Sequence, residues 1–187
     1  MRQIIVAIDF SKCSIHALEY AIQLSNTLKT GITMVWVDAA RTDESVLGPA
    51  DTNRKEITNS FDQLIERYGS QLEQGEISYK IRKGKVHIEV ANQAKYSDAL
   101  MVIAGTHGVT GFEEFWIGSN AYRIVTYAPC PVITIRTSYA YNPSLKRIVV
   151  PIDSTLETRQ KIPFSTKLAK YFDAEIHVLS LYTTTIR

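Results

Sequence analysis

The residues best suited to ligand chemistry lie between positions 105 and 120. Gly105-Thr106-His107-Gly108 is followed, after nine residues, by Gly118-Ser119-Asn120. Glycine lets a backbone approach a ligand closely, and the first turn of a helix presents N–H groups without intrahelical acceptors and a partial positive charge. This pattern indicates a phosphate site, with the glycine turn beside a sugar and first phosphate and the helix start, with the Ser119 hydroxyl, around the others. The alternative is a surface loop whose glycines only make turns and whose Gly-Ser pair only caps a helix.

Two ionisable groups near this pattern could react. Asp9, which ends an apolar run, could act as a general base or lie near Mg²⁺ bound to phosphates. We favour a helix-capping or ribose-bonding carboxylate, because the sequence fixes no second carboxylate beside it. His107 could assist phosphoryl transfer, although a residue between two glycines is more often a conformational or hydrogen-bonding element. We therefore assign no catalytic residue and no metal held by the protein, with Mg²⁺ near Asp9 only through phosphates.

Motifs of other nucleotide sites are missing. The sequence has no G-x-x-x-x-G-K-[ST], and Phe10-Ser11-Lys12 stands where a dinucleotide signature G-x-G-x-x-G would belong. An NAD enzyme is therefore not expected. The segment 105–120 also lacks lysine and arginine, which argues against a fast ATPase because phosphoryl-transfer sites normally carry such a cation.

Short apolar runs alternate with helical spacings of apolar residues over the first 136 residues. The run 4–8 indicates a strand buried on both faces, and Ser11 can cap the helix after it. Further strands are expected at 32–37, 77–82, 100–104 and 132–135, helices at 57–72, 86–95 and 119–127, and a polar loop at 38–53. Strands that alternate with helices pair in parallel. We therefore predict an open doubly wound α/β domain, a parallel five-stranded sheet with helices on both faces, whose ligand lies near Asp9, Val37 and the loop after Ala104.

The start of this pattern recurs 144 positions later. Ile4-Ile5-Val6-Ala7-Ile8-Asp9 matches Ile148-Val149-Val150-Pro151-Ile152-Asp153, and the same shift aligns apolar positions of the following helix and strand. We therefore expect a complete domain at 1–137, a turn-like linker at 138–145 and a partial second repeat, strand-helix-strand, at 146–187. So short a repeat buries too little core to fold alone. We expect it to pack on a neighbour in a homodimer or higher oligomer.

Charge and composition exclude several classes of protein. With 21 Lys+Arg against 19 Asp+Glu and no basic run, the net charge of +2 predicts no nucleic-acid partner. No apolar run approaches the roughly 18 residues that span a bilayer, and the N-terminus lacks a secretory pattern, so we expect a cytoplasmic protein with no membrane partner. Cys13 and Cys130 form no metal or disulfide pattern and are expected to be buried free thiols.

Taken together, these motifs resemble the universal stress protein family. The spacing G-x-x-G, nine residues, G-[ST] is that family's ATP-binding signature, and Gly105, Gly108, Gly118 and Ser119 match it in full. The apolar run that closes in Asp9, the Gly-Thr-His-Gly turn and the segment Ala128-Pro129-Cys130-Pro131-Val132 are also similar, within residues 1–136. The resemblance implies a Rossmann-like fold of the adenine-nucleotide alpha-hydrolase type.

The resemblance also implies the residues of an ATP site. Asp9 corresponds to an acid that contacts the adenosine part, the Val37 backbone to an adenine contact, and Ala104 to the wall of the adenine pocket. Asn120 departs from the small aliphatic residue common at this position, but it keeps the backbone N–H that a phosphate needs. The implied site comprises Ala7, Ile8, Asp9, Val37, Ala104, Gly105, Thr106, His107, Gly108, Gly118, Ser119 and Asn120.

The sequence alone is compatible with three functions. The resemblance favours an ATP-binding module of the stress response, regulated by its adenine nucleotide, with at most slow hydrolysis. The same fold could instead be an adenine-nucleotide hydrolase or transferase whose second substrate enters beside residues 38–53, or a dimerisation module independent of nucleotide. Family domains pair through their last strands, here 132–135, which agrees with the expected oligomer.

Overall fold

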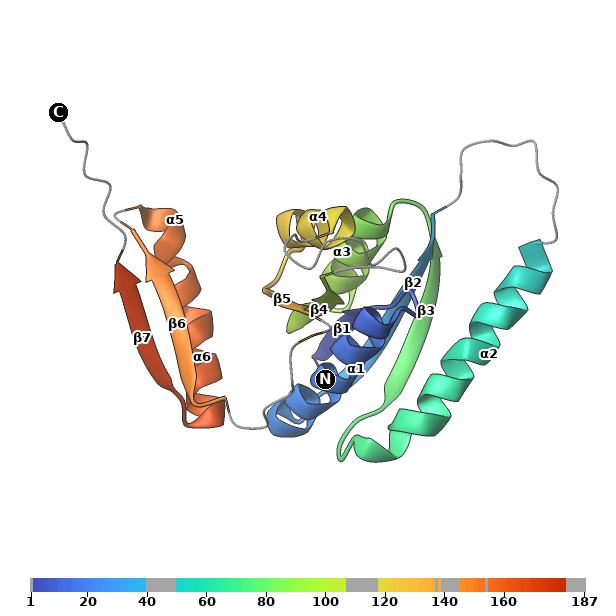
Figure 1. Cartoon of the computed structure of the whole chain (residues 1–187), viewed down its shortest axis with the longest axis horizontal. Coiled ribbons are helices and arrows are strands. Elements are labelled where there is room, and N and C mark those ends of the chain that lie inside the picture. The colour runs from blue at the N-terminus through green and yellow to red at the C-terminus, as the bar shows by residue number, and fades with distance from the viewer. Residues whose placement is uncertain are drawn as a thin grey trace. The chain divides into compact units, whose positions relative to one another are not determined.

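The structure, a computed structural model, describes residues 2–39, 50–106, 118–136, 138, 145–153 and 155–180, with the backbone alone for 50–53. By its contacts the chain divides into two compact units, Met1–Tyr139 and Ala140–Arg187. Figure 1 shows the elements of each unit. Throughout the described residues, every helix is too short or too polar to span a bilayer.

The first unit alternates strands and helices along the chain. Its strands are β1 (Gln3–Ala7), β2 (Gly31–Asp38), β3 (Ile77–Lys83), β4 (Met101–Gly105) and β5 (Val132–Ile135). Its helices are α1 (Lys12–Leu28), α2 (Ala50–Tyr68), α3 (Val86–Tyr96) and α4 (Ser119–Tyr127), with a 3-10 turn at Gly69–Gln71. The predicted elements are present, with small shifts at their ends except in α2.

The prediction for α2 is wrong at both ends. The helix begins at Ala50, inside the predicted polar loop 38–53, because polar residue types alone do not separate a loop from the first turn of a helix. At the other end, Gly69 opens the 3-10 turn, so Leu72 lies beyond the helix to which its spacing assigned it.

The five strands form one parallel sheet in the order β3-β2-β1-β4-β5. The predicted fold class, an open doubly wound α/β sheet, is confirmed. The strand order reverses at β1, because the chain builds outward through β2 and β3 on one side and then through β4 and β5 on the other. The carboxyl ends of β1 and β4 therefore flank the point where such folds bind ligands.

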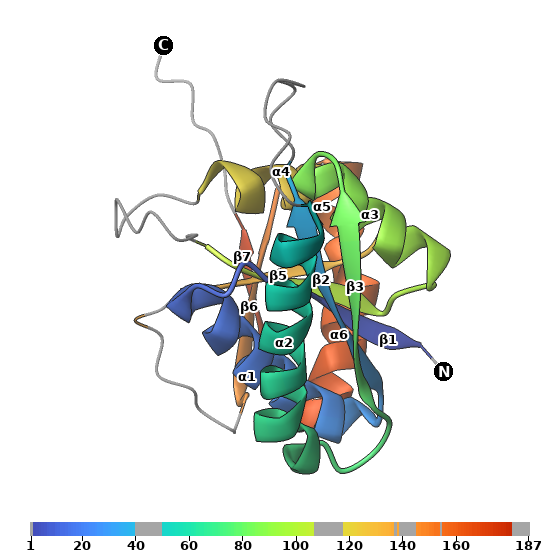
Figure 2. The same ribbon diagram turned by 90° about the vertical axis from the view of Figure 1, so that its right-hand side faces the viewer.

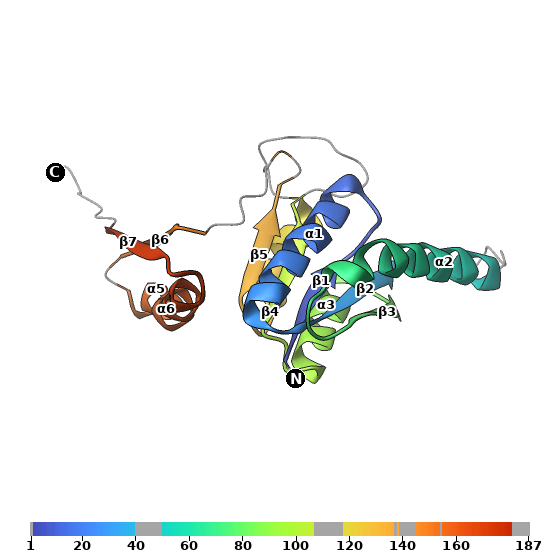
Figure 3. The ribbon, with the colours of Figure 1, turned by 90° about the horizontal axis from the view of Figure 1, so that it is seen from below.

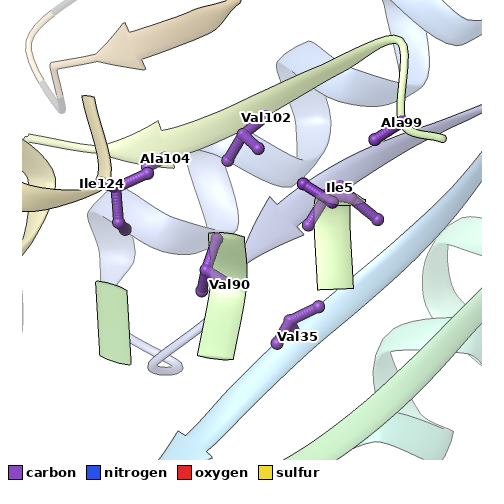
Figure 4. Packing of buried hydrophobic residues seen from close by; sticks show 8 residues of the cluster. Ile5, Val35, Val90, Ala99, Val102, Ala104 and Ile124 are labelled. Carbon is purple, nitrogen blue, oxygen red and sulfur yellow. The ribbon is translucent and has the colours of Figure 1, made fainter. Parts of the chain in front are cut away.

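The core lies between the sheet and the helices that cover it. The helices α3 and α4 lie side by side on one face, and α2 lies on the opposite side of β2 and β3 (Figure 1). Under α3 and α4, buried aliphatic side chains of the central strands interlock with Val90 and Ile124, as Figure 4 shows for Ile5, Val35 and Val102. This packing fixes the position of α4, and with it the helix start that the sequence assigns to phosphate.

The second unit contains β6 (Arg147–Ile152), α5 (Leu156–Arg159), α6 (Lys161–Phe172) and β7 (Glu175–Ser180). The parallel register of β6 and β7 follows that of β1 and β2 at a shift of 144, since Gln3 faces Gly31 and Arg147 faces Glu175. Both helices lie on one side of the strand pair (Figure 3). On the other side, Val149 and Leu179 are 62% and 50% exposed, so among the described residues of this unit no helix covers this face as α3 does in the first unit.

Candidate functional site

A cavity of about 330 Å³ lies at the carboxyl ends of β1, β2 and β4. Its volume is within the range of about 300 to 1,000 Å³ that small-molecule sites occupy. The residues that line it come from the strand ends, the turn after β1, the starts of α1 and α3, and the N-cap and first two turns of α4. They are Ala7, Ile8, Asp9, Ser14, Val35, Trp36, Val37, Val86, Ala104, Gly105, Thr106, Gly118, Ser119, Asn120, Ala121 and Ile124.

The turn after β1 holds Asp9 at this cavity. The Ile8 N–H donates to the carbonyl of Val35 (2.9 Å), which extends the pairing of β1 and β2 past Ala7. The Asp9 N–H donates to Ser14 Oγ (3.3 Å), and Asp9 Oδ1 accepts from the N–H of Ser11 (3.0 Å). Ser11 in turn caps α1, as predicted, because its Oγ accepts from the N–H of Ser14 (3.2 Å). Asp9 is therefore fixed by the helix start.

The carboxyl end of β4 passes close to α1. A Cβ atom built on Gly105 would lie 2.8 Å from Cys13 Sγ and 2.9 Å from the carbonyl carbon of Cys13. The missing side chain thus faces α1, and glycine is required at 105 for packing. This requirement is independent of a ligand, and it differs from the turn and the close approach to phosphate that the sequence predicted for Gly105.

The start of α4 is tied to the end of β4. The Gly118 N–H donates to the carbonyl of Thr106 (2.7 Å), and the Thr106 N–H donates to the carbonyl of Ile135 (2.9 Å). The N-cap of α4 is Gly118, which has no side chain to bond the first helical N–H groups. The helix begins at Ser119, so Ser119 and Asn120 lie in its first turn, at the cavity. Helix N-termini of this kind attract anions.

The side of the cavity toward β2 and β3 is apolar. Val37 at the end of β2 and Val86 at the start of α3 contribute aliphatic surface there, and Ala104 and Ile124 add more from β4 and α4. Val35, Ala104 and Ile124 also belong to the core cluster of Figure 4, so the wall of the cavity is as firmly packed as the core itself. A ligand that fits would carry a flat apolar group at one end and an anionic group at the other.

The cavity brings together ten of the twelve residues that the resemblance implied, and His107 and Gly108 lie outside the described residues. Six lining residues were not among those predicted: Ser14, Val35, Trp36, Val86, Ala121 and Ile124. Val86 could have been found, because the helix after β3 also begins at the carboxyl edge of the sheet. Ile124 could have been found from its position one turn after Asn120.

Charged groups are sparse around the cavity. Asp9 is the one carboxylate among the described lining residues, and no lysine or arginine is among them. His87, next to Val86, is buried with its ring 4.9 Å from that of Tyr127. Burial, assisted by the charges of Arg123 and Lys85, lowers the pKa of His87, so this ring stays neutral at neutral pH. In the described part of the chain, no three His, Cys, Asp or Glu side chains gather as a metal site would require.

The parallel five-stranded sheet, with a cavity where the strand order reverses, defines a doubly wound α/β protein with a Rossmann-like fold. The universal stress protein family model matches residues 1–136. The chain therefore belongs to the universal stress protein family, and the predicted resemblance is confirmed.

Individual relatives agree with this assignment. Universal stress protein YxiE of Bacillus subtilis is 25% identical over 147 residues, which cover 72% of this chain and 98% of the relative. A universal stress protein solved in complex with cAMP superposes with a TM-score of 0.59 at 14% identity, covering 73% of this chain and 98% of that one. A universal stress protein from Archaeoglobus fulgidus has a TM-score of 0.75 at 16% identity and covers 97% of this chain, but only 67% of its own length is matched.

Proposed function

We propose that the first unit binds ATP in this cavity and acts as a nucleotide-responsive regulatory module of the stress response. The observation that supports the proposal is the division of the cavity into an apolar end, at Val37 and Val86, and a polar end, at Asp9 and the start of α4. Adenine has a flat apolar surface and triphosphate is anionic, so ATP matches both ends. A universal stress protein of the same fold has been solved with another adenine nucleotide, cAMP.

Each part of the cavity has a role in this proposal. The Val37 backbone and the Ala104 side chain would contact adenine, and the Asp9 carboxylate would accept a hydrogen bond from a ligand hydroxyl. The N–H groups of Ser119 and Asn120 would bind phosphate oxygens, because the first turn of a helix supplies donors without intrahelical acceptors. Any Mg²⁺ would be held through the phosphates, with Asp9 as the one carboxylate among the described lining residues.

We propose that ATP hydrolysis, if it occurs, is slow. Fast phosphoryl transfer depends on a cation that stabilises charge on the transferred group. The described lining residues offer helix N–H groups but no lysine or arginine. This favours a protein that responds to nucleotide over a hydrolase or transferase.

The proposal is tested by titration calorimetry of the whole chain with ATP and by mass spectrometry of any nucleotide that copurifies. Asp9→Asn should weaken ATP binding at least about tenfold, since a hydrogen bond to a charged group contributes about 1.5 to 3 kcal/mol. Asp153→Asn, 144 positions later, is the matched control and should leave the affinity unchanged. Absence of ATP binding by the wild-type chain would contradict the proposal.

We further propose that the second unit is the start of a tandem repeat and packs on a neighbouring chain in a homodimer or higher oligomer. The shared register of β1–β2 and β6–β7 and the exposed Val149 and Leu179 support this. Light scattering at micromolar concentration should give at least twice the monomer mass, and a monomeric mass would contradict it.

A further inference from the structure

The residue after Asp9 has a backbone conformation that side chains disfavour. Phe10 has a φ of 61°, in the left-handed region where glycine is the usual residue. Lys29 and Asp173 share this conformation as C-caps of α1 and α6, where a left-handed residue commonly ends a helix. Phe10 ends no helix, and its turn leads from β1 into α1. Such a conformation persists only where the surrounding structure holds it.

A row of aromatic rings holds Phe10. Its ring meets that of Phe61 edge-on, with centroids 5.1 Å apart and planes at 62°. Phe61 in turn stacks on Tyr79 of β3, at 4.5 Å and 4°. Phe61 is completely buried, so the contact is protected from water. The turn that carries Asp9 is thereby joined to α2 and, through α2, to the edge strand β3.

The helix α2 has few other anchors. It runs alongside β3 (Figures 1 and 2). Among its described side chains only Phe61 and Tyr68 are buried. Tyr68 Oη donates to Glu19 Oε1 of α1 (2.8 Å), at the end of α2 far from the cavity. Phe61 therefore joins α2 to the Asp9 turn by its contact with Phe10.

We propose that Phe10 is a positioning residue whose ring, held by Phe61, keeps the backbone in the conformation that sets Asp9 at the cavity, so that docking of α2 and binding of nucleotide favour each other. The inference rests on the proposed function, because it takes the ligand of the cavity to be a nucleotide. The coupling is reciprocal: whatever loosens α2 weakens the site, and whatever occupies the site tightens α2.

Amide hydrogen exchange of the ligand-free chain tests the positioning. Phe10→Leu keeps a side chain that disfavours the backbone conformation at this position but removes the ring, and Phe61→Leu removes the ring that contacts Phe10. Both should speed exchange of the Ser11 and Ser14 amides, which bond within the turn, by about tenfold. Phe10→Gly should have a smaller effect because glycine tolerates the conformation. Tyr96→Leu, at a side chain with 81% exposure on α3, is the aromatic control. Unchanged exchange in Phe61→Leu would overturn the positioning role.

Addition of ATP tests the coupling. In the wild-type chain ATP should slow exchange of the α2 amides around Phe61, and this slowing should vanish in Phe10→Leu. The double variant Phe10→Leu/Phe61→Leu should bind ATP no more weakly than Phe10→Leu alone, because both changes break the same contact. ATP binding with no change in α2 would overturn the coupling and leave the proposed function intact. Absence of ATP binding would overturn the proposed function and the coupling, while the ligand-free exchange still decides whether Phe10 positions the turn.

Discussion

The turns after β1 and β6 have some hydrogen bonds in common but leave their aspartates in different surroundings. In both, the aspartate N–H donates to a hydroxyl five residues later, Ser14 Oγ at 3.3 Å or Thr158 Oγ1 at 3.2 Å. Asp153 Oδ1 accepts from the N–H of Thr155 (2.8 Å), its hydroxyl (2.6 Å) and the Thr158 hydroxyl (2.9 Å). Asp9, within the described residues, accepts only from the N–H of Ser11.

The difference lies in how the hydroxyl two residues after the aspartate is used. Ser11 Oγ accepts from the helix N–H of Ser14, whereas Thr155 makes no side-chain cap bond and donates to Asp153 instead. The first turn therefore leaves its carboxylate with bonding capacity at a cavity, and the second satisfies its carboxylate locally. The same local sequence pattern can thus build either a ligand group or a purely structural turn.

The largest difference between the two units should be in how much stability is lost when equivalent strand residues are truncated. Ile5 is completely buried, and its equivalent 144 positions on, Val149, is 62% exposed. Ile5→Ala should cost about 2 to 5 kcal/mol in urea unfolding, because the change leaves a cavity in the core. Val149→Ala should stay within about 0.5 kcal/mol. A large loss from Val149→Ala would show that this face is covered in solution and would favour the proposed oligomer.

Removing the hydroxyl two residues after each aspartate should give a smaller difference in the free energy of unfolding. Ser11→Ala should lower the free energy of unfolding by about 1 kcal/mol, since it removes the N-cap oxygen of α1. Thr155→Ala removes no cap bond, so its effect on helix stability should be smaller. Both are measured by chemical denaturation followed by circular dichroism, and equal losses would remove the distinction between the two turns.

The smallest expected effect is the dependence of stability on the protonation of Asp153. Hydrogen bonds from Thr155, and then from Thr158, lower the pKa of Asp153 below its ordinary value of 3.8. A lowered carboxyl pKa stabilises the fold above the ordinary value, and this contribution is lost as the pH falls through the lowered one. Carboxyl NMR titration should therefore show a midpoint below 3.8, raised by Thr155→Val and unchanged by Ser165→Ala in α6. A midpoint insensitive to Thr155 would contradict the bonding seen here.

The sequence predicted the elements because they follow from periodic patterns, whereas the site residues that lie at the cavity were implied by the resemblance to the family. The buried run before Asp9 and the helical spacing of Leu18 and Ile22 reflect the geometry of a covered parallel sheet. The left-handed Phe10 had no such signal, because its conformation depends on Phe61, 51 positions away. The packing role of Gly105 was hidden for the same reason, since Cys13 approaches it only in the folded chain.

The hydrogen bond from Gly118 to Thr106 joins the two ends of segment 107–117. Because folding brings these ends together, the entropy of closing the segment is lost before any ligand arrives. Closure entropy grows slowly with length, by about 0.6 kcal/mol for each doubling. Insertions between Thr106 and Gly118 should therefore cost the fold little, which makes this position suitable for grafting a reporter peptide that responds to the cavity.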